Sequence, residues 1–131
     1  MDWREAKIGA QVNPGWEPLV DALHERMLNL DPDVRVDQVK EKFGGLRYYF
    51  TSEYGREEGT IGVAITKLVQ MAEARSLTTC EVCGGLAMDG PTPNPRGWLN
   101  TLCPEHMEIR DRTGEPVWRI AGGQYEWEKT E

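Results

Sequence analysis

The chain has 131 residues, of which 15 are Lys or Arg and 22 are Asp or Glu, so its formal net charge is −7. A chain of this length buries about two thirds of the surface of its unfolded form, which suffices for one hydrophobic core and not for two. Its apolar runs are far shorter than the about 20 residues that span a bilayer, and MDWREAK at the N-terminus lacks the apolar stretch of a signal peptide. We therefore expect residues 1–131 to form a single domain that is neither membrane-spanning nor exported.

The acidic balance argues against a surface built to wrap nucleic acid, because phosphate binding requires clustered Lys and Arg, but it leaves room for a local basic patch. The three cysteines do not supply the even number that a secreted disulfide scaffold needs. A reducing cytoplasm is the expected location, and there the thiols are free to bind a metal ion.

Residues 1–15 end in Asn13-Pro14-Gly15, a cluster that favours turns, so we expect regular structure to begin after it. From residue 16 to residue 30, apolar side chains recur at helical spacing, which predicts an amphipathic helix. A second helix of this kind is predicted over 60–76. The apolar positions of the two helices are Leu19, Leu23, Met27 and Leu30, and then Ile61, Ile65, Leu68 and Ala72.

Residues 34–51 carry Gly44-Gly45 between two β-prone runs, the pattern of a β-hairpin with a two-residue turn. With these glycines as the loop, Phe43 faces Leu46, and Val39 pairs with Phe50 on an apolar face. The polar face then places Lys42 opposite Arg47, and Lys40 opposite Tyr49. Continuing this register would turn Asp37 toward the core, so we expect a bulge or an early end of pairing near Gln38.

The segment 84–97 holds three prolines and is expected to be mostly loop, since each proline removes a backbone donor. At the C-terminus, 117–120 and 124–127 flank Ala121-Gly122-Gly123 and predict a short hairpin. The predicted fold class is α+β. It comprises a helix-hairpin-helix part over 15–77, a metal-binding module of treble-clef or zinc-ribbon type over 78–112, and a hairpin or tail over 113–131.

The strongest chemical signal is a pair of two-ligand motifs, Cys80-Glu-Val-Cys83 and Cys103-Pro-Glu-His106, separated by nineteen residues. Three thiolates and one imidazole complete the tetrahedron that Zn²⁺ prefers, and each spacing suits a tight knuckle or the first turn of a helix. Because no coordination position remains for a water nucleophile, the predicted Zn²⁺ is structural. The competing interpretation is three free thiols, or one disulfide with a spare cysteine.

A resemblance rests on the blocks QVKEKFGGLRYY, CEVCG and GWLNTLCPEH, together with Ala72-Glu73 and Ser76 between them. Over residues 15–106 the chain resembles a group of small, uncharacterised bacterial and phage proteins. The resemblance implies a bacterial cytoplasm or a phage-infected host cell as the location, and a shared zinc site. It implies nothing about catalysis.

The sequence contains few candidates for catalytic residues. It has no GxSxG or Walker-type motif, and His24 is the one histidine left once His106 is a metal ligand. The sequence favours a solvated helix position for His24 rather than a general base. A small metal-dependent nuclease stays as an alternative, although the second metal site that such enzymes use is not evident.

The basic side of the hairpin, formed by Lys40, Lys42, Arg47 and Tyr49, is the candidate binding face. Like charges opposite each other repel, so we expect a negative group nearby, either a carboxylate of the same chain or an external anion. Five tryptophans favour protein contacts, and one of them, Trp98, is expected to pack beside the metal site. The leading hypothesis is a non-catalytic, zinc-stabilised regulatory protein that binds a protein partner, such as a host factor. Nucleic-acid or phosphate binding by the basic face is the first alternative.

Overall fold

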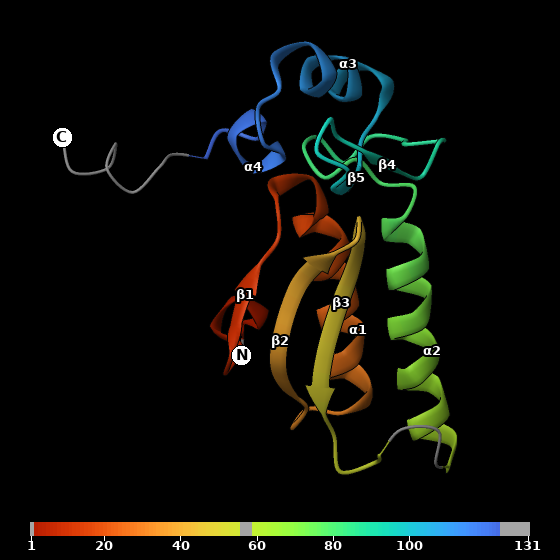
Figure 1. Cartoon of the computed structure of the whole chain (residues 1–131). Helices are drawn as coiled ribbons and strands as arrows, with labels where there is room; N and C mark the ends of the chain where they lie inside the picture. The colour runs from red at the N-terminus through yellow and green to blue at the C-terminus, as the bar shows by residue number, and fades with distance from the viewer. Residues whose placement is uncertain (1, 56–58, 124–131) are drawn as a thin grey trace, which may run out of the picture.

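The computed structural model describes residues 2–55 and 59–123, which form an α+β fold in two parts (Figure 1). The first part consists of β1 (Gly9–Gln11), α1 (Glu17–Leu30), β2 (Arg35–Lys42), β3 (Gly45–Thr51) and α2 (Gly59–Ser76). The second part consists of β4 (Pro91–Pro93), β5 (Leu99–Thr101), α3 (Pro104–Thr113) and α4 (Val117–Ile120). The predicted α+β class is confirmed.

Helix α1 covers one face of a three-stranded sheet in the order β1-β2-β3, and α2 runs alongside the edge strand β3 (Figure 1). The two helices lie where the periodicity predicts them, and the main core forms between them and the sheet. Leu23 and Met27 of α1 and Ile65 of α2 are buried in this core. The opposite face of the sheet, called the outer face below, has no described helix over it.

The N-terminal segment is more ordered than the sequence indicates. Residues Trp3–Glu5 form a short 3-10 helix, and β1 pairs in parallel with β2, so the expectation that structure begins after residue 15 is wrong. Trp3 is buried and its indole N–H donates to the carboxylate of Asp21 at 2.7 Å. A strand of three residues is too short to show the alternation by which strands are recognised.

The hairpin forms, but its loop lies one residue earlier than predicted, so residues 38–42 of β2 each pair with a partner two residues away from the predicted one. The two-residue loop is Phe43-Gly44, so Lys42 pairs with Gly45, and Arg47 lies opposite Lys40 rather than Lys42. Both loop residues have positive φ, 56° and 81°, as a type I′ turn requires. The sequence pattern misassigned the loop because phenylalanine is rare at such a position.

The expected irregularity near Gln38 is confirmed, since the register shifts between Val36 and Gln38. The bulge keeps the charged Asp37 out of the core: the hydroxyl of Thr51 donates to its carboxylate at 2.7 Å, while Val36 remains buried. The bulge therefore reconciles a charged residue with a strand that faces the core.

Helix α2 protects the free edge of β3. The hydroxyl of Ser76 accepts the backbone N–H of Leu46 at 2.9 Å, and the carboxylate of Glu73 accepts that of Tyr48 at 3.2 Å. Two donors of an edge strand are thereby satisfied within the chain, which removes a site for strand addition by other molecules.

The second part of the chain lies across one end of the sheet (Figure 1). Segment 84–97 is not only loop, because β4 pairs with β5 within this part, with Thr92 between the two prolines of the strand.

The predicted C-terminal hairpin is wrong at its first strand: Val117–Ile120 is helical, beginning after Pro116. A four-residue apolar run does not distinguish helix from strand by periodicity. Its predicted partner, 124–127, lies outside the described residues. No described helix is long and apolar enough to cross a membrane.

Candidate metal centre and binding face

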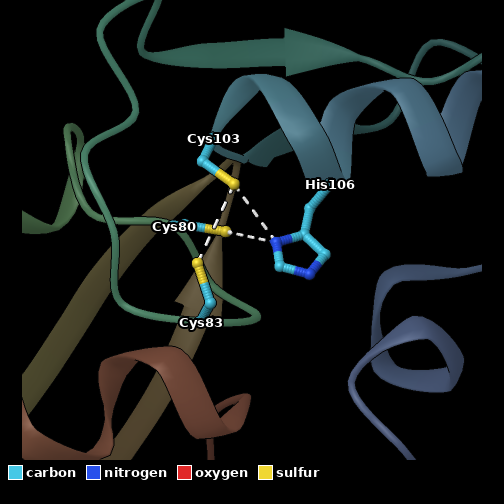
Figure 2. A group of neighbouring side chains, drawn as sticks. All are labelled: Cys80, Cys83, Cys103 and His106. Carbon is cyan, nitrogen blue, oxygen red and sulfur yellow. Dashed lines mark hydrogen bonds between the residues drawn. The ribbon is translucent and has the colours of Figure 1, made fainter.

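The four predicted ligands converge on one point (Figure 2). Cys80 and Cys83 come from the turn that follows α2, while Cys103 and His106 come from the start of α3. The ligand atoms of all four residues lie within 4.8 Å of one another. The first three are sulfur atoms, and the fourth is Nδ1 of His106, which faces the thiols (Figure 2).

The distances fit a metal tetrahedron better than a disulfide. Sγ of Cys83 lies 3.8 Å from Sγ of Cys103, whereas a disulfide requires about 2.05 Å. Zinc bonds of about 2.3 Å to sulfur place two thiolates about 3.8 Å apart. Nδ1 of His106 is 3.1 Å from Cys103 Sγ and 3.7 Å from Cys80 Sγ. All three cysteines are free thiols, so the disulfide interpretation is not supported.

The knuckle around Cys80 and Cys83 is shaped by the glycines that follow. The backbone N–H of Gly84 donates to the carbonyl of Cys80 at 2.9 Å, with Gly84 at a φ of 78°, and the N–H of Gly85 points to the sulfur of Cys83 at 3.3 Å. Burial raises the pKa of the Cys80 thiol, but backbone N–H groups of the knuckle and of Cys103 outweigh it and hold that pKa below its ordinary value. Cys80 is thus prepared to be a thiolate.

Cys83 behaves differently. Burial, opposed by the N–H of Gly85 and reinforced by the neighbouring sulfurs of Cys80 and Cys103, raises its pKa to about 11. Three sulfurs this close do not all ionise near neutral pH unless a cation sits between them. The donor set therefore suits a thiophilic metal ion, whose binding would release protons from the thiols.

Helix α3 presents the other two ligands. Cys103 is its N-cap and Pro104 its first residue, a position where the missing N–H of proline costs nothing. The buried Arg110, further along α3, donates to the carbonyl of Thr92 at 2.9 Å and so ties the helix to β4. The spacing of Cys103 and His106 thus corresponds to the first turn of a helix, as the sequence predicts.

Glu81, between the first two ligands, is a residue whose role the sequence reasoning missed. It is fully buried, and its carboxylate accepts the backbone N–H of Thr101 at 2.8 Å and the side-chain amides of Asn13 and Asn100 at 3.3 and 3.4 Å. Burial, opposed by these hydrogen bonds, raises its pKa to about 7. Glu81 thereby joins the knuckle to β5 and to the N-terminal segment, and a charged residue between two ligands was its one visible signal.

Gly15 completes the joint between the two parts. Its N–H donates to the carbonyl of Glu81 at 2.7 Å. A β-carbon on Gly15 would overlap the carbonyl oxygen of Cys80 and lie 2.6 Å from that of Glu81. The indole N–H of Trp16 donates to the carbonyl of Thr79 at 2.8 Å. The metal knuckle is thus docked on the start of α1.

The candidate binding face lies on the outer face of the sheet. Lys40 and Arg47 are directly opposite each other, with Lys42 two positions along β2. Arg47 donates one N–H to the carbonyl of Leu46, and Nζ of Lys40 lies 5.9 Å from the ring centre of the exposed Tyr49. Within residues 2–55 and 59–123, no carboxylate forms an ion pair with the three cations.

Two side chains differ from their sequence-based expectations. His24 is buried rather than solvated, and its Nδ1 lies 2.9 Å from the hydroxyl of Tyr48 inside the core. Burial raises the pKa of that tyrosine above its ordinary range. Trp98, expected to pack beside the metal ligands, is 71% exposed.

Comparisons with known proteins found no family model, no curated protein and no solved structure that matches this chain.

Proposed function

We propose that the protein is a non-catalytic binding protein held in shape by one structural Zn²⁺, and that it binds nucleic acid through the outer face of its sheet. The observation that carries the proposal is the cluster of Lys40, Lys42 and Arg47 beside an exposed tyrosine, a cluster that forms no ion pair with a carboxylate of the described residues. The sequence favoured a protein partner, and the open basic face now favours an anionic one.

The case for zinc rests on the donor set. Three thiolates and an imidazole are the ligands of closed structural zinc sites. A glycine knuckle, the β4-β5 hairpin and a helix that begins at its third ligand are the parts of a treble-clef arrangement. With four protein ligands the ion keeps no position for water, which argues against the nuclease alternative.

The arrangement of the cations favours a chain of phosphates as the ligand rather than a single anion. Lys40 and Arg47 repel each other by roughly 0.2–1 kcal/mol, and a negative ligand between them would reverse that cost. Lys42 continues the row along β2 toward the turn, where Nζ lies 5.5 Å from the ring of the exposed Phe43. Cations beside exposed aromatic rings are the usual elements of sites for single-stranded nucleic acid.

The proposal is tested by the salt dependence of binding. Three phosphate contacts to a single strand predict a slope of about −2 in a plot of log affinity against log salt. Replacing two of the cations, in the double variant Lys40→Gln with Arg47→Gln, should make the slope shallower by about 1.4, because each contact contributes about 0.7. Fluorescence anisotropy of a labelled oligonucleotide measures both slopes.

The matched control places the same charge change on the helical side. Arg26 of α1 and Lys67 of α2 are exposed, so Arg26→Gln with Lys67→Gln should leave the slope of the wild-type protein unchanged. Equal losses in both double variants would indicate a general charge effect and contradict the proposal. So would an absence of salt-dependent binding in the wild type.

A protein partner is the second candidate, favoured by the apolar side chains exposed on the zinc module. Met88 is 79% and Leu86 64% exposed, both in the loop between the knuckle and β4. The double variant Leu86→Ser with Met88→Ser tests this candidate. If protein contacts are the function, the variant loses a partner that binds the wild type, while the basic-face variant retains it.

A further inference from the structure

A groove of about 620 Å³ runs between the outer face of the sheet and the metal-binding module. Its walls come from three segments that are far apart in the sequence: β1 and β2, the β4-β5 hairpin, and α4. Lys40 of the basic face lines it, so the groove is continuous with the cation row described above. Its lining also includes Trp98, Trp118 and several side-chain amides.

Two tryptophans give the groove flat apolar walls. Trp98, in the turn before β5, leaves 71% of its surface exposed, and Trp118 of α4 leaves 37%. The exposed ring of Trp98 offers a flat apolar surface on which a planar ligand can stack. The backbone around Trp98 is fixed, since the side-chain oxygen of Asn94 accepts the N–H groups of Arg96 and Trp98 at 2.8 and 2.9 Å.

The remaining walls carry amides with unused hydrogen-bonding atoms. Gln11 and Gln38 project from the outer face and make no side-chain hydrogen bond to any other described residue. Asn13 and Asn100 use their NH₂ groups on Glu81, so their carbonyl oxygens stay available. Asn94 has the opposite arrangement, because its oxygen is occupied and its NH₂ group is not. The groove therefore offers both donors and acceptors to a flat polar ligand.

We infer that this groove receives an unpaired base of a single-stranded nucleic acid whose phosphates lie along the basic face. The inference rests on the proposed function and extends it from phosphate binding to strand selection. A base needs an aromatic surface for stacking and amides for its edges, and its backbone needs nearby cations. The groove and the adjoining row of Lys40, Arg47 and Lys42 supply these three elements in one continuous surface.

A duplex does not fit the same surface. Its bases are stacked on one another, so neither Trp98 nor the groove amides reach them, and only the phosphates remain to be bound. The basic face alone would bind single and double strands with little discrimination. A preference for the single strand is therefore the specific consequence of the groove.

The test uses an oligothymidylate of about 12 nucleotides and its duplex with oligoadenylate as probes. The wild type should bind the single strand at least tenfold tighter than the duplex, with quenching of tryptophan fluorescence. Trp98→Ala should lose about tenfold or more of the single-strand affinity, as expected for a lost stacking contact, and should keep the salt slope of the wild type. Trp98→Phe should restore part of the loss. Met88→Ala, on the exposed loop outside the groove, is the control and should bind as the wild type does.

The outcomes separate the inference from the proposed function. If the wild type binds single and double strands with equal affinity and Trp98→Ala changes neither affinity, the inference is wrong while the proposed function stands. If the wild type shows no salt-dependent binding of either probe, both are wrong. If Trp98→Ala abolishes binding of a peptide and leaves the single-strand affinity intact, the groove serves a protein partner and the inference is overturned.

Discussion

Gly15 shows how a single missing side chain holds the two parts of the molecule together. Its backbone lies against the carbonyls of Cys80 and Glu81, where a β-carbon has no room. Gly15→Ala should therefore lower the free energy of unfolding by about 2–3 kcal/mol, because backbone atoms must move apart. Chemical denaturation of the metal-loaded protein measures the change.

Gly114→Ala is the control for this variant. Gly114 ends α3 at a φ of 71° with no atom near the site of a β-carbon, so alanine there costs only the strain of the left-handed backbone, about 1 kcal/mol. A Gly15→Ala variant as stable as the wild type would show that the knuckle does not dock as described.

Glu81 makes the free energy of unfolding depend on pH. Its pKa is raised from 4.5 to about 7, because burial outweighs the hydrogen bonds from Thr101, Asn100 and Asn13. The folded state thus binds the proton more tightly than the unfolded state. This contribution to stability is complete below pH 4.5, and it is lost as the pH rises through 7, by about 3 kcal/mol at most. The carboxyl carbon of Glu81 should titrate near pH 7 by nuclear magnetic resonance, and a midpoint at or below 4.5 would contradict the burial argument.

At the scale of elements, the β2-β3 turn holds a residue that its geometry does not favour. Phe43 has a φ of 56° and an exposed ring, although asparagine or glycine suits this position of a type I′ turn. Phe43→Asn should raise the free energy of unfolding by up to about 1 kcal/mol, seen as a higher thermal midpoint. The same variant should bind oligonucleotides more weakly, since the ring beside Lys42 is lost. A Phe43→Asn variant that gains both thermal stability and oligonucleotide affinity would contradict a binding role for this turn.

Helix α2 and the edge of β3 form the second element-scale case. Ser76→Ala leaves the buried N–H of Leu46 without its acceptor, and the cost of such a donor is about 1–3 kcal/mol. Thr78→Ala is the matched control, because the Thr78 hydroxyl is exposed and bonds only to the carbonyl of Arg75. Equal stability of the two variants, measured by denaturation, would show that α2 does not protect the strand edge.

The features that the sequence predicts correctly are those encoded by one short segment of the chain. The periodicity of α1 and α2 and the spacing of the four ligands each lie within one short segment, so one residue pattern defines each. The hairpin register depended on whether Phe43 or Gly45 joined the turn, and the sequence pattern favoured the two glycines because phenylalanine rarely adopts the positive φ that Phe43 has. The groove around Trp98 needs three distant segments, and no local pattern encodes its shape.

At the scale of the whole molecule, the second part depends on its metal ligands. Its core cluster consists of Cys80, Leu102, Cys103 and Val117, so two of the four residues of this cluster are proposed ligands. So small a core does not fold alone, and zinc binding can supply on the order of 10 kcal/mol. The main core around α1 and the sheet holds fifteen buried residues and none of the ligands. We therefore expect chelation to unfold the second part first and to remove one wall of the groove.

The central claim is the metal ion itself, and native mass spectrometry of protein purified without chelators tests it most directly. The account predicts one Zn²⁺ per chain, with the loss of a proton from each of the three thiols, and no zinc in the Cys103→Ala variant. A folded wild-type protein that carries no metal ion, or one whose thermal midpoint is unchanged after complete chelation, would contradict it.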